Sequence, residues 1–426
     1  MLDINLIRET PDLVKAGMKK RNMDASMVDK ARQLDARRRE LLQEVETLKG
    51  QRNVVSKEIS AMKDKAAKEK KIAEMRTVGD KIDTLDGELA KVDAGLNDLM
   101  ANIPNIVEDR VPAGGEEANV VAKEWGQKPK FDFKPKPHWD LGPELGIIDF
   151  DQGVNLTGSR FYVLSGPGAR LQRALIAWML DLHIRQGYTE KYTPFLVRSA
   201  TLFGAGQLPR FAENLYKDHE EDLYLIPTAE VPLTGLHMGA ILDEADLPRR
   251  YTAYSPCFRR EKMSAGRDVR GIKRGHQFDK VEMYKFCTPE TSVQEFEQMV
   301  ADAEATCQAL NLPYRLLLKA AGDTSEAAHI SYDIEVWAGG CEEWLEVSSI
   351  SRVGEYQARR AAIRYRPKGE KGTRYVHTIN GSGLGLPRTL IAVLENNQQA
   401  DGSVRIPEVL LPWMGGIDTI RPDEKI

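Results

Sequence analysis

Three charged residues on two neighbouring predicted strands could hold a phosphorylated nucleotide beside an amine. Arg259 and Glu261 lie two residues apart in a predicted strand at 251–261, so both face the same side of it. Glu282, in a second predicted strand at 277–286, can face them from the adjoining strand. A guanidinium binds a phosphate through two parallel hydrogen bonds, and a carboxylate accepts a hydrogen bond from an amine. The pattern suits a nucleotide beside an amino acid, although Arg-x-Glu taken alone is more often a surface salt bridge.

A run of glycines ends in an arginine that could bind an anion. Residues 381–388 read Gly-Ser-Gly-Leu-Gly-Leu-Pro-Arg, and a helix is predicted to begin at Pro387. A glycine turn that opens a helix offers backbone N–H groups and the positive end of the helix dipole, and Arg388 adds a guanidinium. The alternative is a glycine turn followed by an arginine that faces solvent.

Two further segments place carboxylates and hydroxyls near predicted strand ends. Thr228-Ala-Glu230 precedes Val-Pro, and a predicted hairpin with its turn at 338–341 returns through residues 344–349. In that return strand Glu346 could hold Mg²⁺, because this cation prefers oxygen ligands and nucleotide phosphates can complete its coordination. Taken singly, each of these polar groups is more often satisfied within the protein than used as a ligand.

The elements that carry these residues predict an α+β fold with an antiparallel sheet. From residue 138 to the end, strand-like runs bounded by Gly and Pro occur with few helices between them. Neither G-x-G-x-x-G nor G-x-x-x-x-G-K-[ST] is present, so neither a Rossmann fold nor a P-loop is indicated. We expect a helical arm at 1–105, a loop-rich linker at 106–137 and a catalytic domain at 138–426.

The arm is predicted to be an antiparallel coiled-coil hairpin over about residues 27–101. Thr10 and Pro11 predict a short packed helix before it. Apolar residues recur every seven positions in the first leg, at Leu34, Leu41, Leu48, Val55 and Met62, and in alternating threes and fours after Met75. Between the legs, residues 63–71 contain no apolar side chain larger than alanine, so we expect the turn there. At about 1.5 Å per residue the hairpin would be some 50 Å long.

Charge separates the two legs of this hairpin. The first leg, residues 30–71, is net +6, whereas the second leg, residues 72–101, is net −4. One interpretation is that ion pairs form between the legs, since coiled coils commonly carry such charges. The other is that the basic leg binds RNA, and the two interpretations are compatible.

Composition limits the partners and the compartment. The net charge of −4 and pI near 6.1 give no global basic field, so a nucleic-acid contact must come from a local patch, and no DNA partner is expected. The four cysteines have neither a CxxC nor a His-linked spacing, which argues against a disulfide framework and a zinc site and favours the reducing cytoplasm. The most apolar stretch, 171–184, contains Arg173, Asp181 and His183, so no membrane segment is expected.

Together and in this order, these segments resemble motifs two and three of the class II aminoacyl-tRNA synthetases. The chain is similar from end to end to the bacterial seryl-tRNA synthetase family. The points of agreement are Gly206-Gln-Leu-Pro-Arg-Phe211, Ile226-Pro-Thr-Ala-Glu-Val-Pro232, Phe258-Arg-Arg-Glu261, His276-Gln-Phe-Asp-Lys-Val-Glu282, Gln357-Ala-Arg-Arg360 and Asn380-Gly-Ser-Gly383. The helical hairpin sets this family apart from other class II members.

The resemblance implies a six- or seven-stranded antiparallel sheet and a homodimer formed partly through motif one, here the helix 170–186 and the strand reaching Pro194. It implies that serine is activated with ATP and Mg²⁺ to seryl-adenylate, without zinc, and passed to tRNA(Ser), with tRNA(Sec) as a second candidate acceptor. The RNA element implied is the long variable arm of the tRNA.

The resemblance also implies a role for individual residues. Arg259 would hold the α-phosphate, Arg388 the γ-phosphate and Glu261 the adenine. Glu346 and Ser349 would hold Mg²⁺. The serine pocket would comprise Thr228, Ala229, Glu230, Glu282 and Ser382, and the ATP site would further include Arg260, Val347 and Ser348. The basic arm residues expected to contact RNA phosphates are Arg37, Arg38, Arg39, Lys63, Lys65, Lys68, Lys70 and Lys71.

The sequence departs from the family pattern at a few positions near this site. Lys262-Met263 replaces an expected Ala-Gly pair, Gly235 and Arg352 each replace an expected Asn, and residues 324–330, ending in Ile330, replace a glycine-containing loop that usually ends in lysine. These changes spare the residues named above but could alter loop closure or contacts with the tRNA acceptor end.

Three other functions remain alternatives. The chain could be a divergent paralog or an inhibitor-tolerant second copy, an amino-acid activating enzyme with another acceptor, or a non-catalytic RNA-binding protein that keeps the fold. The intact arm argues against another acceptor. A protein without catalysis is disfavoured by the presence of Arg259, Glu261, Glu282, Glu346 and Arg388.

Overall fold

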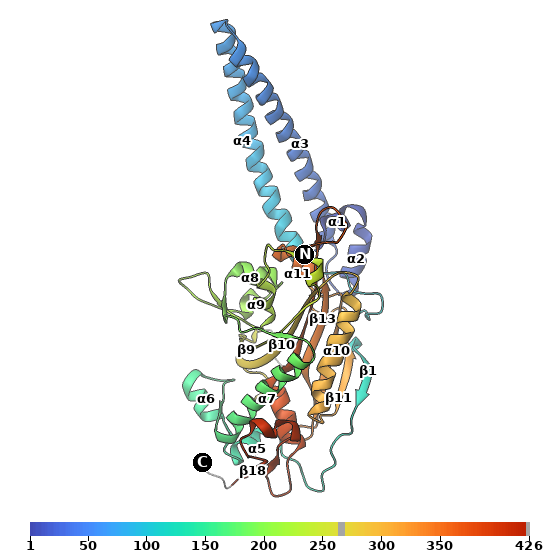
Figure 1. The fold of residues 1–426 in the computed structure, drawn as a ribbon. Helices are drawn as coiled ribbons and strands as arrows, with labels where there is room; N and C mark the ends of the chain where they lie inside the picture. Colours follow the sequence, from blue (N-terminus) through green and yellow to red (C-terminus); the bar gives the residue numbers. More distant parts are fainter. Residues whose placement is uncertain (263–268, 423–426) are drawn as a thin grey trace. The chain divides into compact units, whose positions relative to one another are not determined.

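The computed structural model describes residues 1–262 and 269–422 and divides into two compact units, Met1–Pro104 and Asn105–Ile426 (Figure 1). The first unit is entirely helical among its regular elements, and the second is built around a large sheet. The α+β prediction is confirmed.

The first unit consists of two short helices and a long helical hairpin. Its helices are α1 (Ile4–Glu9), α2 (Pro11–Lys20), α3 (Ser26–Ala61) and α4 (Lys65–Asn102). The second helix begins at Pro11 as predicted, but the Thr10 hydroxyl donates to the Leu6 carbonyl and does not cap α2. The turn between α3 and α4 is shorter than the predicted 63–71, because the Asp64 carboxylate accepts the N–H groups of Ala66 and Ala67 and starts α4 at once.

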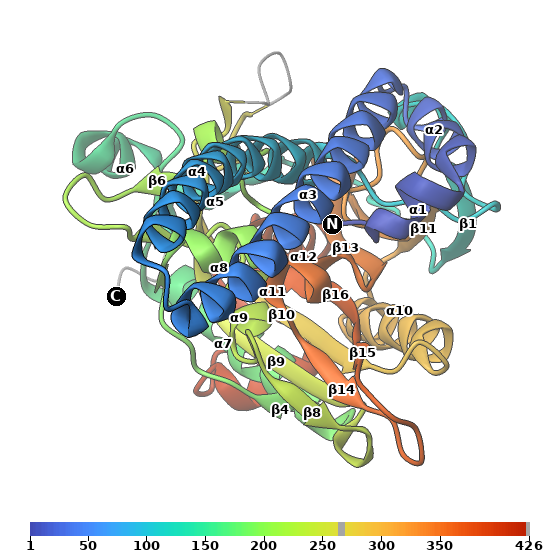
Figure 2. The ribbon, with the colours of Figure 1, turned by 90° about the horizontal axis from the view of Figure 1, so that it is seen from above.

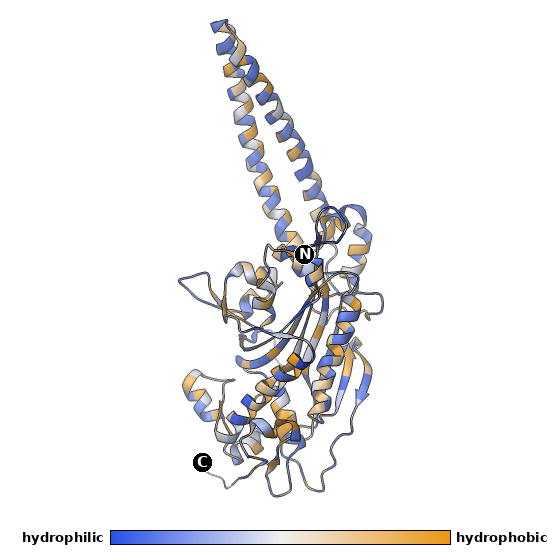
Figure 3. Cartoon of the chain, viewed as in Figure 1, coloured by the Kyte–Doolittle hydropathy of each residue, from blue (hydrophilic) through white to orange (hydrophobic). Residues whose placement is uncertain are grey.

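The hairpin is held by the apolar seam that the heptad pattern predicts. Leu41 and Val45 of α3 pack against Leu85 of α4, and all three are buried. Figure 3 shows hydrophobic positions interrupting long hydrophilic stretches on both helices. The arrangement is typical of an antiparallel coiled coil, in which only one stripe of each helix is apolar.

The second unit contains an eight-stranded sheet, whereas the family resemblance implies six or seven strands. The strand order is β1-β11-β12-β13-β16-β10-β9-β4, antiparallel except for the edge pair β4 and β9. The bounds are β1 (Val120–Trp125), β4 (Thr189–Glu190), β9 (Arg249–Phe258), β10 (Gln277–Cys287), β11 (Tyr314–Leu318), β12 (Ile330–Ala338), β13 (Glu343–Gly354) and β16 (His377–Gly385). The extra strand arises because the predicted linker, 106–137, lies in the second unit and supplies β1 to the sheet edge.

Three long helices cover one face of this sheet, and the candidate site occupies the other. The helices are α7 (Gly166–Arg185), α10 (Ser292–Ala309) and α12 (Leu386–Asn396). Alternation along β10 divides the faces: Val281 and Met283 join the core under these helices, whereas Tyr284 packs with α9 and α11. Both faces are therefore covered, which explains why most of β10 is buried.

Smaller elements complete the second unit. They are α5 (His138–Glu144), β2 (Ile148–Asp149), α6 (Phe150–Thr157), β3 (Val163–Leu164), β5 (Leu196–Val197), α8 (Ser199–Gly204), β6 (Tyr216–Lys217), β7 (Tyr224–Leu225), α9 (Glu230–Gly235), β8 (Ile241–Asp243), α11 (Tyr356–Ala361), β14 (Arg364–Arg366), β15 (Arg374–Tyr375), β17 (Val404–Arg405) and β18 (Thr419–Ile420). Figure 2 shows β8 beside β14, with which it pairs in parallel.

The glycine-rich segment before α12 is a strand, so the predicted glycine turn is wrong. Gly381 to Gly385 belong to β16, which lies between β13 and β10 in the sheet. A Cβ on Gly381 would lie 2.9 Å from the Ile350 side chain, and one on Gly383 would lie 2.1 Å from His183 Nε2. These glycines therefore allow close packing against both neighbours and do not supply the reversal of a turn.

Candidate functional site

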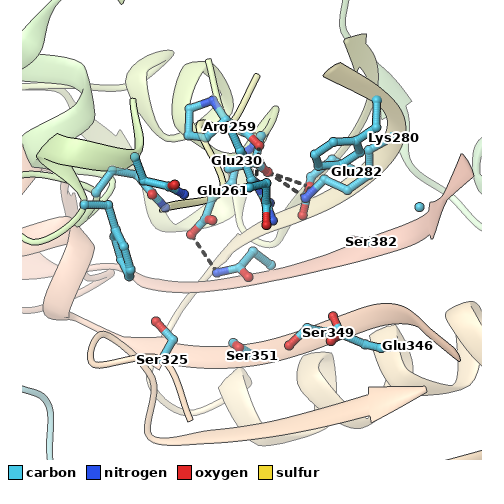
Figure 4. A pocket seen from close by; sticks show the side chains of 18 of the residues that line it. Glu230, Arg259, Glu261, Lys280, Glu282, Ser325, Glu346, Ser349, Ser351 and Ser382 are labelled. Atoms are coloured by element: carbon cyan, nitrogen blue, oxygen red, sulfur yellow. Dashed lines mark hydrogen bonds and ion pairs between the residues drawn. The ribbon is translucent and has the colours of Figure 1, made fainter. Parts of the chain in front are cut away.

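A cavity of about 480 Å³ lies on the sheet face opposite α7, α10 and α12 (Figure 4). Its floor is formed by side chains of β10, β13 and β16, and the segments 205–215 and 227–230 contribute to its walls. Among the residues predicted for a site, those that line it are Thr228, Glu230, Arg259, Glu261, Glu282, Glu346, Val347, Ser349, Ser382 and Arg388. Residues far apart in the sequence are thus brought to one pocket.

A bulge in β13 places Glu346 on the pocket face. Residues three apart in a regular strand face opposite sides, so Glu346 and Ser349 would not meet. In the pairing with β12, Ser348 lies opposite Ile334 and Glu346 lies opposite Glu335. Val347 therefore has no partner of its own and is the extra residue of a bulge. Both the Glu346 carboxylate and the Ser349 hydroxyl therefore line the cavity (Figure 4).

A second bulge lies in β16, beside the predicted serine pocket. Leu384 pairs with Val281 and Ser382 pairs with Glu282, so Gly383 is the extra residue. Asn380 and Ser382 share the pocket face because they are two apart, and the bulge brings Gly385, beyond it, to the same cavity.

At one end of the cavity a lysine, a hydroxyl and a carboxylate form a buried cluster. Lys280 Nζ lies 2.7 Å from Thr228 Oγ1 and forms an ion pair with Glu282. The Thr228 hydroxyl lies 2.9 Å from Glu282 Oε2. All three side chains are buried, so an amine that enters here meets a desolvated carboxylate.

A second carboxylate, Glu230, stands at the same end. Its Oε1 atom accepts hydrogen bonds from Gln357 Nε2 at 2.6 Å and from Asn380 Nδ2 at 3.0 Å. Burial and the nearby Glu282 carboxylate raise the pKa of Glu230 to about 7, against the opposing effect of Lys280. An ammonium group bound here would relieve this repulsion and favour the ionised form.

Two guanidiniums line the part of the cavity that extends from the carboxylates to α12. Arg259 donates to the Pro227 carbonyl at 3.2 Å, and its guanidinium lies over the Phe278 ring, 4.9 Å from the ring centroid. Arg388 lies in the first turn of α12, where it donates to the Glu346 carbonyl at 2.8 Å. The positive end of the α12 dipole and both guanidiniums make this part of the cavity suited to phosphates.

Cations around Glu346 keep its carboxylate ionised. Burial alone would raise the pKa of Glu346, but Arg388, Lys319 and Arg259 lower it overall. The Arg388 guanidinium lies 3.6 Å from Glu346 Oε2. An ionised carboxylate and a hydroxyl on one face are oxygen donors of the kind that Mg²⁺ prefers.

Arg259 and Glu261 reach the cavity from a loop, not from the strand predicted to carry them. The strand β9 ends at Phe258, and Glu261 has a positive φ of 50°. Both side chains nevertheless line the pocket, and Arg274 approaches Glu261 to 3.8 Å.

Three residues predicted for the site lie outside the cavity lining. Arg260 Nε donates to the Leu215 carbonyl at 2.9 Å, so this arginine supports a wall of the pocket. Ala229 is fully buried among apolar residues. The Ser348 hydroxyl donates to the Ser382 carbonyl at 2.7 Å and holds β13 to β16 beneath the site.

The sequence interpretation missed several residues that line the cavity. Phe278 and Lys280 precede Glu282 by four and two positions on β10, so strand alternation alone could have identified them. Asn380 likewise lies two positions before Ser382. Gln357 contacts Glu230 from α11, and no local pattern in the sequence indicates that contact.

Among the described departures from the family pattern, the segment 324–330 contributes Ser325 and Ala327 to the cavity lining, and the others lie around the cavity. Arg352 forms an ion pair with Glu108 at 2.5 Å, Ile330 is buried at the start of β12, and Lys262 is exposed. Gly235 ends α9, where a Cβ would lie 2.7 Å from Thr201 Cγ2. Met263 lies outside the described residues.

The basic residues of the hairpin separate into two groups. Arg37 pairs with Glu88 at 2.9 Å and Arg38 with Asp93 at 2.5 Å across the legs, while Arg39 lies 3.2 Å from Asp35 of the same helix. Lys71 pairs with Glu58 across the tip. Within the residues that the structure describes, no ion pair involves the other four lysines of the tip, which are Lys63, Lys65, Lys68 and Lys70.

A buried cluster of His138, Cys341 and Glu395 has ligand atoms within 4.8 Å of one another. Its hydrogen bonds are already satisfied internally: His138 Nδ1 lies 2.8 Å from Glu395 Oε1, and His138 Nε2 accepts the Ile272 N–H. Glu395 Oε2 also accepts the N–H groups of Gly340 and Cys341. The cluster therefore ties the start of α5 to α12 and to the turn between β12 and β13.

Over residues 1–262 and 269–422, none of the helices combines the length and apolarity needed to span a membrane.

Comparison with known proteins agrees with this geometry along the whole chain. Residues 1–107 match the family model for the seryl-tRNA synthetase N-terminal domain, and residues 212–397 match the tRNA synthetase class II core domain (G, H, P, S and T). A serine–tRNA ligase of Roseiflexus sp. (strain RS-1) is 62% identical over 99% of this chain and 100% of its own length.

Solved structures show the same fold. A seryl-tRNA synthetase from Pyrococcus horikoshii, complexed with ATP, has a TM-score of 0.93 and 38% identity, covering 100% of both chains. A cytoplasmic serine–tRNA ligase from Naegleria fowleri, in complex with AMP, has a TM-score of 0.87 and 31% identity, covering 99% of both chains.

Proposed function

The chain belongs to the seryl-tRNA synthetases, the class II enzymes that join serine to tRNA, and on that premise we propose how its residues divide the work. Serine binds at the end formed by Thr228, Glu230 and Glu282, and ATP binds along Arg259 and Arg388. The observation that carries this proposal is that one cavity holds the Glu230 and Glu282 carboxylates, with Arg259 beside them, and also Arg388 at a helix N-terminus.

The proposed chemistry proceeds in two displacements. The serine carboxylate attacks the α-phosphorus of ATP, the bond to the β-phosphate oxygen breaks, and pyrophosphate leaves. The terminal ribose hydroxyl of tRNA then attacks the seryl carbonyl, and AMP leaves. No side chain needs to form a covalent bond, so catalysis comes from positioning and from electrostatic stabilisation of charge on phosphorus.

Within this scheme the two arginines have distinct roles. Arg259, beside the carboxylate end, holds the α-phosphate, and Arg388, at the N-terminus of α12, holds the γ-phosphate. Glu261, in the loop after β9, accepts a hydrogen bond from the adenine. The support is their common position in the cavity lining, with Glu261 two residues from Arg259 and Arg388 at the start of α12.

We further propose that Glu346 and Ser349 hold Mg²⁺ with the ATP phosphates. The bulge in β13 places both oxygen donors on one face, and the surrounding cations keep Glu346 ionised. When bound, the ion supplies charge neutralisation for the phosphates. The chain contributes the two donors and keeps Arg388 beside them.

The hairpin is proposed to bind tRNA(Ser) through its tip. Lys63, Lys65, Lys68 and Lys70 are charged, close in sequence and without ion pairs in the described structure, so they can exchange counterions for RNA phosphates. Arg37, Arg38 and Arg39 are engaged with carboxylates of the hairpin. We therefore assign the arginines mainly to inter-leg and intra-leg pairing and the lysines to RNA.

We also propose that the chain forms a homodimer. The helix α6 exposes Val154 and Leu156, with Leu156 76% exposed, and Ile184 of α7 is also exposed. Exposed apolar side chains on and near the motif-one helix, 170–186, suit contact with a partner subunit. Light scattering should give twice the chain mass of 47.8 kDa.

The proposed compartment is the reducing cytoplasm. All four cysteines are free, and three of them are buried. Structural disulfides are typical of oxidising compartments, and their absence among four cysteines favours a reducing one.

The decisive experiment is serine-dependent exchange of pyrophosphate into ATP. Replacing Arg259 or Arg388 with Ala should lower exchange by about 10² or more, because each removes a charge that faces the reacting phosphates. Arg315→Ala is a matched control, since Arg315 pairs with Glu335 outside the cavity. Near-normal exchange by a folded Arg259 or Arg388 variant would remove that residue from the mechanism.

A further inference from the structure

The segment Gln357-Ala-Arg-Arg360 has no role in the proposed chemistry, yet it forms the helix α11 directly behind the amino-acid end of the cavity. Gln357 and Arg360 are three residues apart, so they lie on the same side of the helix. Gln357 is 1% exposed. A buried side-chain amide must satisfy both its N–H groups and its oxygen, so its partners reveal what it holds in place.

The Gln357 amide makes four hydrogen bonds. Its nitrogen donates to Glu230 Oε1 at 2.6 Å and to the Ala205 carbonyl at 2.9 Å. Its oxygen accepts from the hydroxyls of Thr378 at 2.6 Å and Tyr284 at 3.0 Å. These partners belong to four different segments of the chain, and two of them, Ala205 and Glu230, line the cavity.

This set of partners permits one orientation of the amide. A carbonyl oxygen such as that of Ala205 can only accept, so the amide nitrogen must face it. If the amide were flipped, its oxygen would face the Ala205 carbonyl and the Glu230 carboxylate, and both interactions would become repulsive. The Gln357 N–H toward Glu230 is therefore fixed by the fold.

Arg360 extends the same support to the neighbouring wall. Its guanidinium donates to the Leu208 carbonyl at 2.8 Å and to the Tyr356 hydroxyl at 2.9 Å. It also lies over the Phe203 ring, 5.0 Å from the centroid. One side of α11 thus holds both Glu230 and the segment 203–208 that adjoins the cavity.

We propose that Gln357 is a positioning residue of the amino-acid pocket: it aims the Glu230 carboxylate at the ammonium group of serine and favours its ionised form. The inference rests on the proposed role of Glu230 in binding serine. Two N–H donors, from Gln357 and Asn380, end on the same oxygen of Glu230, and this pairing stabilises a carboxylate more than a carboxylic acid.

Other charged groups face Glu230 and set the background for this effect. Glu282 and Lys280 approach from β10, and Arg259 approaches from the loop after β9. Burial and Glu282 favour the protonated acid, whereas Lys280, Gln357 and Arg259 favour the carboxylate. Because the pKa of Glu230 is about 7, the removal of one stabilising donor changes the ionised fraction within the physiological range.

The test is the pH dependence of serine activation in Gln357→Met, measured by pyrophosphate exchange over about pH 6 to 9. In the unmodified chain, kcat/KM for serine should decrease as the pH is lowered below about 7, because Glu230 becomes protonated. This decrease is the acid limb of the pH profile. In the variant this acid limb should move up by about one pH unit, and the KM for serine at pH 7.5 should rise about tenfold. The KM for ATP should change less than about twofold, because the guanidiniums are untouched.

Gln398→Met is the matched control. Gln398 is also a buried glutamine, and its amide bonds with Lys136 and with the Glu395 carbonyl, outside the cavity lining. It should lose similar stability without any change in the acid limb. Thr378→Val provides a milder variant that keeps Gln357 but removes one donor to its oxygen, and it should move the limb in the same direction by a smaller amount.

Three outcomes decide between the possibilities. A normal acid limb and a normal serine KM in folded Gln357→Met would overturn the inference, as would equal increases in the KM for serine and ATP. If Gln357→Met does not fold, an unchanged limb in Thr378→Val would overturn it instead. If Glu230→Gln binds serine normally, the proposed role of Glu230 is wrong. If Glu230→Gln loses serine binding and Gln357→Met does not, Glu230 binds serine but Gln357 does not position it.

Discussion

Glu230 and Glu282 show how a small pocket can prefer a cation although it already holds one, Lys280. Glu282, which is buried, and Glu230, which is partly buried, stand near each other with one lysine, Lys280, beside them. When the pocket is empty, burial and mutual repulsion raise the pKa of Glu230 to about 7. When an ammonium group enters, the same two charges attract it. The pocket therefore gives up stability in the free protein for affinity toward an amine.

This arrangement predicts how the stability of the ligand-free protein depends on pH. A carboxyl whose folded pKa lies above its unfolded value stabilises the fold at low pH, and this contribution is lost as pH rises through the folded pKa. With values of about 7 folded and 4.5 as the ordinary value, the loss should occur between these pH values. Thermal unfolding of Glu230→Gln should show a smaller decrease in Tm from pH 5 to pH 8 than the unmodified chain, and equal decreases would contradict the assignment.

The same residues predict that the pocket distinguishes serine from alanine by the serine hydroxyl. A pocket lined by Thr228, Glu282 and Ser382 leaves buried polar groups unpaired when alanine replaces serine. Alanine should therefore be activated at least 10³-fold less efficiently, on the order found for sites that recognise a hydroxyl by hydrogen bonds. Competition in pyrophosphate exchange measures the ratio, and a ratio within tenfold would mean that the hydroxyl is not recognised here.

At the scale of elements, strand alternation predicts half of the site and the bulges decide the rest. Lys280 and Glu282 share a face because they are two apart, and this can be read from the sequence. Glu346 and Ser349 share a face only because Val347 is an extra residue in β13, and no rule of sequence spacing signals that bulge. The glycines of β16 predict a turn because glycine most often marks one, whereas here the close approach of Ile350 and His183 requires them.

The fold itself is more predictable than its details. The heptads of the arm and the antiparallel α+β class follow from local periodicity, which operates over a few residues. The eighth strand does not follow from local periodicity, because β1 pairs with β11 about 190 residues later and its sequence, Val-Val-Ala-Lys-Glu-Trp, is short and does not alternate regularly. Long-range pairings of this kind, like the hydrogen bond of Gln357 to Glu230, depend on tertiary structure.

Packing of α7 against β16 gives a prediction of its own. Gly383→Ala should place a methyl group 2.1 Å from His183 Nε2, so either the strand or the helix must move and serine activation should fall at least tenfold. His183→Ala alone should cost about 2–4 kcal/mol of stability through a cavity, measured by denaturant unfolding. The double variant should regain activation relative to Gly383→Ala, and failure to regain any would show that the close approach is not the cause.

At the scale of the molecule, the hairpin and the sheet unit carry separate parts of the reaction. Each unit has its own apolar core, with Leu41 and Leu85 in the hairpin and the residues under α7, α10 and α12 in the other. The adenylate chemistry that we propose uses only the cavity of the second unit. The RNA-binding lysines that we propose lie at the tip of the first.

Removing residues 30–100 and joining the ends with a flexible Gly-Ser linker should therefore separate the two activities. Serine-dependent pyrophosphate exchange should stay within about threefold of normal, while charging of tRNA should fall by 10² or more because the RNA phosphates no longer meet these lysines. Circular dichroism would confirm that the remaining chain is folded. Normal charging by the shortened chain would show that the hairpin serves only the structure.

Substitution of single charges should identify which residues of the hairpin bind RNA. Replacing Lys63, Lys65, Lys68 and Lys70 with Gln should lower the slope of log affinity against log salt by about 0.7 to 0.9 for each RNA phosphate that is no longer neutralised. The matched control replaces Arg37 and Arg38, which pair with Glu88 and Asp93, and should leave this slope nearly unchanged while lowering Tm. The reverse result would assign RNA binding to the arginines.

The placement of β1 at the sheet edge has a consequence for synthesis of the chain on the ribosome. The two legs of the hairpin pair around one tip, so the whole hairpin can form as soon as Asn102 has emerged. The strand β1 emerges next but must wait for β11, about 190 residues later, which at 5–20 residues per second is roughly 10 to 40 s. During that interval the nascent chain carries a finished hairpin and a strand whose backbone N–H and C=O groups lack their final partner, β11. An unpaired strand of this kind can pair with another chain, so this edge of the sheet is exposed to mispairing until β11 emerges.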